Sequence, residues 1–317
     1  MNKGINRENK DRLFKFIFGN EKNKAWTLSL YNAVNGSSYS DPEAIEFTTI
    51  DDVLYMGMKN DISFLIADIM NIYEHQVTFN PNMPMRFLIY LGMIYSKYTE
   101  NNKHRMNLYS TTLQKYPLPK LVCFYNGLAD TEDKMELRLT DAFDTTKGEP
   151  DVEVKVTMLN INYGRNTELL NSCQVLQEYA WFVERIRKNQ EETGELEKAV
   201  ALAISQMPDD ALIKSFIVAN KAEVTRMCIT EYDEAQTMEM FREEGRREGQ
   251  KEGRKEGRIE GRIEGRKEGR MEGRIEGRME LLFDFVQQKI ISTEEAARQA
   301  ELTVEDFNRR METYQKS

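Results

Sequence analysis

The chain has 317 residues, 40% of them hydrophobic and 31% charged, a balance typical of a soluble globular protein with room for more than one domain. Its net charge of −9 argues against binding nucleic acid through bulk electrostatic attraction alone. The two histidines are too few for a histidine-rich metal cage, a zinc hydrolase or an HNH-type nuclease.

Other signals exclude further classes of protein. There is no run of about 18 apolar residues and no apolar leader, so we expect neither a membrane span nor secretion. Cys123, Cys173 and Cys228 are far apart and are interpreted as reduced thiols of a cytoplasmic protein. No GxxxxGK[ST] loop and no GxGxxG motif after a strand are present, so hydrolysis would have to rest on carboxylates and a hard metal ion.

Residues 1–165 mix helical and strand patterns. Apolar residues with helical spacing predict helix over 7–34, ended by the turn residues 35–38. Two apolar runs, 61–66 and 69–77, predict an antiparallel hairpin. The other elements expected here are strands over 50–58, 121–125 and 152–161 and a helix over 85–97. Because 121–125 is almost wholly apolar, it indicates an α/β domain whose mixed or parallel sheet is flanked by helices.

The rest of the chain has helical patterning. Residues 166–241 predict a helical extension in which Pro208–Asp210 separates two helices. Residues 242–278 contain nine tetrads that end in glycine, and each glycine costs about 0.8–1 kcal/mol in a helix relative to alanine. This repeat is either a charged spacer or a helix that forms against a partner, which leaves homo-oligomerisation open. Residues 279–317 predict a small helical segment that includes a helix start at Ser292.

The residues most informative about chemistry lie in the expected hairpin. Asp61 begins its first strand and Glu74 lies near the end of its second, so the two are neighbours, and opposite Cβ atoms lie about 4.5–5.5 Å apart. Gln76 follows Glu74 by two positions and therefore faces the same side. Two carboxylates at that separation can share a divalent metal ion, and the backbone carbonyl of His75 could add a further ligand.

Asp61 followed by Glu74-His75-Gln76 resembles the D…(D/E)xK core of the PD-(D/E)XK nucleases. More closely, it resembles their transposase-like branch, the recombination-promoting nuclease (Rpn) family. Four further blocks agree with this resemblance: Lys10-Asp11-x-x-Phe14-Lys15-x-Ile17-Phe18, Asp52-Val53-Leu54-Tyr55, Asn82-Met83-Pro84-Met85-Arg86 and Phe124-Tyr125-Asn126-Gly127. The resemblance covers roughly residues 7–165 and implies a restriction-endonuclease-like core, which is a small mixed sheet flanked by helices. It also implies Mg²⁺-dependent endonucleolytic cleavage of DNA in mobile-element or recombination biology.

On this hypothesis Asp61 and Glu74 hold one Mg²⁺, or Mn²⁺, with the carbonyl of His75 as a further ligand. Gln76 stands where the wider superfamily has lysine, which brings positive charge to the site. Glutamine can only donate and accept hydrogen bonds, so we expect it to orient the attacking water.

Four more residues are candidates near the site. Lys59 and Arg86 could contact the phosphate backbone of DNA, although Arg86 could equally be a surface helix residue. Asp11 and Lys15 either support the site or form only an i,i+4 helix pair.

Three alternatives stay open at this point. Spacing alone fits Asp61 and Glu74 as solvated carboxylates at strand ends. A nuclease fold without cleavage would be a DNA- or protein-binding module. An interaction protein would instead act through the tetrad repeat and the C-terminal helices.

Overall fold

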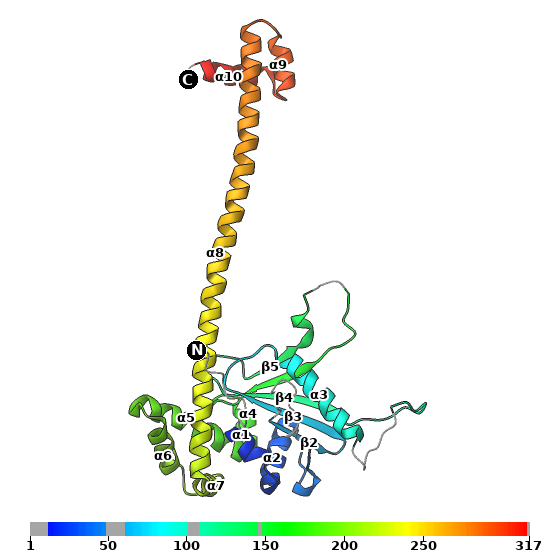
Figure 1. Ribbon diagram of the computed structural model, residues 1–317, viewed down its shortest axis with the longest axis vertical. Coiled ribbons are helices and arrows are strands. Elements are labelled where there is room, and N and C mark those ends of the chain that lie inside the picture. The colour runs from blue at the N-terminus through cyan, green and yellow to red at the C-terminus, as the bar shows by residue number, and fades with distance from the viewer. Residues whose placement is uncertain (1–11, 49–60, 101–107, 145–147, 316–317) are drawn as a thin grey trace, which may run out of the picture. The chain divides into compact units, whose positions relative to one another are not determined.

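The computed structural model describes residues 12–48, 61–100, 108–144 and 148–315. The chain divides into two compact units, residues 1–240 and 241–317. The first is mixed α/β with a six-stranded sheet, and the second is helical (Figure 1). The expectation of an α/β domain followed by a helical region is therefore confirmed. In the described ranges, no helix combines the length and apolarity needed to span a membrane.

The sheet has the strand order β1-β2-β3-β4-β6-β5. β3, β4 and β6 run parallel to one another, and the remaining pairs are antiparallel. The strands are Glu46–Phe47 (β1), Ile62–Ile66 (β2), Ile69–Gln76 (β3), Leu118–Tyr125 (β4), Lys134–Arg138 (β5) and Lys155–Asn160 (β6). This confirms the predicted hairpin and the apolar strand inside a mixed sheet. The strand expected over 50–58 lies outside the described residues.

A two-residue turn sets the register of the hairpin. Ala67 and Asp68 have φ angles of 48° and 61°, the left-handed backbone that a tight turn between antiparallel strands requires. Ile66 then pairs with Ile69, and the ladder continues to Ile62 opposite Tyr73. The next pair in this register is Asp61 and Glu74.

Helices cover both faces of the sheet (Figure 1). α3 (Met83–Glu100) packs on the face that carries Met70, Ile72 and Cys123. The opposite face, with Tyr73 and Phe124, packs against a larger apolar cluster. The helical side chains of that cluster come from α1 (Leu13–Phe18), α2 (Lys24–Asn35), α4 (Thr167–Ser172) and α5 (Gln174–Thr193), and from the later helices of the same unit. Because side chains alternate along β3, successive residues of this strand lie on opposite faces of the sheet.

The helix expected over 7–34 is two helices within the described residues. α1 ends at Phe18 and α2 begins at Lys24, with a 3-10 turn between them. A Cβ on Gly19 would lie 2.9 Å from the carbonyl oxygen of Lys15, and the side chain of Asn20 accepts a hydrogen bond from the amide of Lys22. This local capping breaks the helix although the apolar spacing continues through it.

The helical extension contains α4 and α5, followed by α6 (Leu196–Gln206), α7 (Lys214–Ala219) and α8 (Lys221–Gln287). α6 and α7 flank Pro208–Asp210, as predicted. The tetrads 242–278 lie inside α8, so the structure presents the repeat as helix. In the second unit, the end of α8 packs with α9 (Thr293–Gln299) and α10 (Val304–Gln315) around Leu282, Phe283, Ala296, Ala297 and Phe307.

Candidate functional site

Asp61 and Glu74 lie next to each other and are linked through the main chain. The amide of Asp61 donates a hydrogen bond to Oε1 of Glu74 at 2.9 Å. The amide of His75 donates to Oδ2 of Asp61 at 2.7 Å. Asp61 is 7% exposed and Glu74 is 1% exposed. The structure thus brings together the two carboxylates predicted from the sequence, as a buried pair.

Gln76 lies at the end of β3, two positions after Glu74, and is also buried. Its Nε2 has no hydrogen-bond partner among the described residues. The backbone carbonyl of Gln76 accepts a hydrogen bond from the amide of Asn126, at the end of the neighbouring strand β4, at 2.9 Å. Gln76 therefore has an amide group that is available to bind a ligand or water.

Arg86 on α3 turns toward the carboxylate pair. Its Nη2 lies 3.1 Å from Oε2 of Glu74 and donates to the hydroxyl of Tyr90 at 2.8 Å. Its side chain is 25% exposed, against 1% for that of Glu74. Arg86 is thus an ion-pair partner of Glu74.

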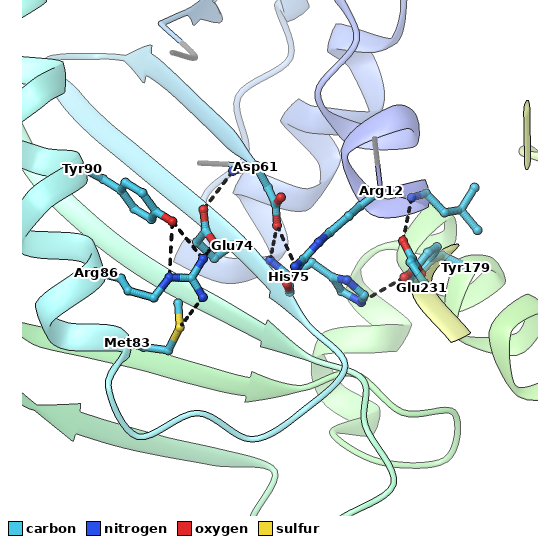
Figure 2. A network of polar contacts seen from close by, with 10 residues as sticks. Arg12, Asp61, Glu74, His75, Met83, Arg86, Tyr90, Tyr179 and Glu231 are labelled. Carbon is cyan, nitrogen blue, oxygen red and sulfur yellow. Dashed lines mark hydrogen bonds and ion pairs between the residues drawn. The ribbon is translucent and has the colours of Figure 1, made fainter. Parts of the chain in front are cut away.

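Arg12, which the sequence analysis did not select, approaches the pair from the other layer. Its Nη1 lies 3.7 Å from Oδ2 of Asp61 and also donates a hydrogen bond to the backbone carbonyl of His75. Figure 2 shows this guanidinium between the two groups. Arg12 therefore contacts two of the three groups that were expected to hold a metal ion. The only sequence signal for it was its place beside Asp11 in the first of the four blocks.

The side chain of His75 points to the opposite face of the sheet from Glu74. Its Nε2 lies 3.0 Å from the hydroxyl of Tyr179 on α5, and its ring stacks on Phe14 with centroids 5.1 Å apart. Burial and the positive charges of Arg12 and Arg187 hold the pKa of His75 well below its ordinary value. The imidazole is therefore neutral and structural, and His75 contacts the carboxylate pair through its main-chain amide, which bonds to Asp61.

Arg12 and Arg86 counteract the unfavourable burial of two neighbouring carboxylates. Burial, and after it the charge of Asp61, raises the pKa of Glu74 to about 8. Arg86 and Arg12 work in the opposite direction, as does the hydrogen bond from the amide of Asp61. A divalent cation on the same oxygens would act in the same direction as the arginines and favour the ionised carboxylate.

The donor atoms at this place fit a hard divalent cation. Two carboxylates and a main-chain carbonyl are the oxygen ligands that Mg²⁺ prefers. In the described ranges there is no cluster of three or more Asp, Glu, His or Cys side chains suited to a metal ion. An ion bound by these three oxygens would leave further coordination positions to water, as Mg²⁺ commonly does.

The supporting candidates are only partly described. Asp11 and Lys59 lie outside the described residues, so neither the Asp11–Lys15 pair nor a phosphate contact by Lys59 is placed. Lys15 is half-buried on α1.

Fold and site together define a mixed α/β protein with a buried acidic pair at strand ends, flanked by two arginines. No protein-family model, no curated protein and no solved structure matches the chain.

Proposed function

We propose that the chain is a metal-dependent DNA endonuclease of the PD-(D/E)XK type, in its transposase-like, recombination-promoting branch. The observation that carries this proposal is the contact between Asp61, directly before β2, and Glu74 on β3, in which the amide of Asp61 donates a hydrogen bond to Oε1 of Glu74. Gln76 continues along β3 on the same face as Glu74. The order helix, strands, helix and strand from α1 to β4 also supports a restriction-endonuclease-like core.

Each of the predicted site residues would have a separate role. Asp61, Glu74 and the carbonyl of His75 would hold the cation, and the amide of Gln76 would orient a water for attack on a phosphodiester bond. When bound, Mg²⁺ or Mn²⁺ would activate that water and offset the charge that develops on the phosphate. Arg86 would keep the carboxylate of Glu74 in place through its ion pair, and Lys59 or the exposed part of Arg86 would contact the DNA backbone.

A second function is favoured by one observation. Asp61 and Glu74 each accept a backbone hydrogen bond and each contact an arginine, so the protein itself supplies partners for both side chains. Gln76 also brings no positive charge to the site. A nuclease fold that binds DNA or another protein without cutting would have the same arrangement.

Nicking of supercoiled plasmid in Mg²⁺ or Mn²⁺ tests the two functions. We expect Asp61→Asn and Glu74→Gln to reduce nicking by more than about 100-fold, since even residues that only orient metal ligands contribute about 10–100-fold. Glu178→Gln on α5 is the control, because Glu178 accepts hydrogen bonds from the amides of Leu212 and Ile213, within the helical extension. Unchanged nicking by both site variants would refute the endonuclease assignment, and a wild type that binds DNA without nicking it would favour the binding module.

A further inference from the structure

Arg187 on α5 is a half-buried cation whose side chain bonds only to neutral groups of the described residues. Its Nη1 donates to Oδ1 of Asn162 at 2.9 Å, and its Nη2 donates to the backbone carbonyl of Asn126. Both acceptors are neutral. Among the described residues, no carboxylate oxygen lies within ion-pair distance of Arg187, and Glu184 and Glu231 act on it only at longer range. Burial without a counter-ion is unfavourable, and it lowers the pKa of Arg187.

The side chain of Asn126 beside it is also incompletely bonded. Asn126 is 1% exposed, and neither its Oδ1 nor its Nδ2 has a hydrogen-bond partner among the described residues. Leaving such a buried amide unpaired costs about 1–3 kcal/mol. On the next strand, Nε2 of Gln76 is unpaired as well. Unsatisfied donors thus occur at the ends of two neighbouring strands.

These groups gather at the carboxyl ends of the parallel strands β3, β4 and β6, the edge at which α/β sheets usually bind ligands. The backbone there is held rigidly. Nδ2 of Asn162 donates to the carbonyl of Gly127 at 3.0 Å and to Oδ1 of Asn160 at 2.9 Å. A Cβ on Gly127 would lie 2.3 Å from the carbonyl oxygen of Val77, so only glycine fits. Arg187 and Asn126 are therefore pre-positioned relative to Gln76.

We propose that Arg187 and the side-chain amide of Asn126 form a phosphate-binding subsite, which takes a backbone phosphodiester of a nucleic-acid strand at the carboxyl ends of the parallel strands. A guanidinium and an amide nitrogen supply donors only, and a planar guanidinium matches phosphate oxygens. The ligand would supply a negative charge that none of the described residues places within ion-pair distance of Arg187. The identity of the ligand rests on the proposed function, whereas the anion site rests on the contacts of Arg187 and Asn126.

Binding of a short DNA duplex, measured by fluorescence anisotropy in EDTA over a range of salt concentrations, tests the subsite apart from cleavage. We expect Arg187→Gln to weaken binding about tenfold and to reduce the slope of log K against log salt by about 0.9, the value for one lost phosphate contact. Arg185→Gln is the matched control, because this substitution removes the same charge from the same helix. Arg185 is also half-buried, and its guanidinium lies over the ring of Trp181 at 5.3 Å. Equal losses in the two variants, or no loss in Arg187→Gln, would overturn the proposal.

A second variant separates binding from folding. Asn126→Asp adds a carboxylate beside Arg187, so we expect it to raise the midpoint of thermal unfolding while it weakens DNA binding. A role of Asn126 in folding alone predicts that stability and DNA affinity change in the same direction, which would contradict the subsite.

Inorganic phosphate distinguishes the source of the anion. We expect tens of millimolar phosphate to raise the midpoint of thermal unfolding of wild type but not that of Arg187→Gln. We also expect phosphate to compete only weakly with DNA for binding. If phosphate stabilises wild type but not Arg187→Gln, and the protein does not bind DNA, the anion site stands but nucleic acid is not its ligand. If phosphate does not stabilise the protein and DNA does not bind, the anion site itself is overturned. DNA binding without nicking would instead refute only the proposed endonuclease activity.

Discussion

The backbone amide of Leu13 donates a hydrogen bond to the carboxylate of Glu231 at 2.8 Å, across 218 positions of the sequence. Leu13 is the first residue of α1, and the residue before it, Arg12, makes no side-chain capping bond to the helix. Glu231 on α8 thus supplies an acceptor that the start of α1 lacks locally. Because Arg12 contacts Asp61, the helical extension supports one side of the carboxylate pair.

Substitutions at Glu231 should reveal this support. Glu231→Ala leaves the amide of Leu13 unpaired, so we expect a loss of about 1–2 kcal/mol in the free energy of unfolding, as for a lost helix cap. Glu231→Gln keeps an oxygen acceptor and should lose less than half of that. Urea unfolding of both variants measures the difference, and equal losses would show that the hydrogen bond to Leu13 is not what stabilises this contact.

The pH dependence of stability should differ between wild type and Glu74→Gln. The pKa of Glu74 is raised from 4.5 to about 8, so between these values the folded protein holds a proton that the unfolded chain releases. The contribution of Glu74 is fully present below pH 4.5 and is lost as the pH rises through about 8. We therefore expect the variant to gain stability relative to wild type as the pH rises through this window. Parallel unfolding curves between pH 5 and 8.5 would contradict the raised pKa.

Arg12 should compete with a divalent cation. It contacts Asp61 and the carbonyl of His75, so a cation held by these groups would have to displace its guanidinium. We expect Arg12→Met to bind Mn²⁺ about tenfold more tightly, equivalent to about 1.4 kcal/mol. The Mn²⁺-dependent rise in the midpoint of thermal unfolding measures this change, since a ligand that binds only the folded state stabilises it. A smaller rise in the variant than in wild type would show that Arg12 helps to hold the cation.

Deletion of residues 242–317 should leave metal-dependent nicking largely intact while it changes oligomeric state or DNA affinity. Glu231 and the described residues of the carboxylate site precede the deletion, whereas Ile259, Ile263, Met271 and Ile275 of the repeat are exposed on α8. Nicking and light scattering on the truncated and full chains check both parts. Complete loss of nicking by a well-folded truncation would place part of the catalytic machinery in the deleted region.

The sequence determined the elements that depend on neighbouring residues. The apolar runs on either side of Ala67-Asp68 define a hairpin, and a two-residue turn leaves one register, so the closeness of Asp61 and Glu74 was predictable. The apolar run 121–125 indicated a strand covered on both faces for the same local reason. β5 was missed because Lys134, Glu136 and Arg138 alternate with its apolar residues at the sheet edge, which gives no apolar run.

Only the tertiary structure decided which charges surround the pair. Arg86 and Arg187 lie on α3 and α5, and Arg12 directly precedes α1. No spacing rule distinguishes these three from surface arginines. Their contacts with Asp61, Glu74 and Asn126 exist because α1, α3 and α5 pack on opposite faces of one sheet and meet at the ends of its strands. Packing sums many weak apolar contacts across the whole unit, whereas a hairpin register depends on a few adjacent residues.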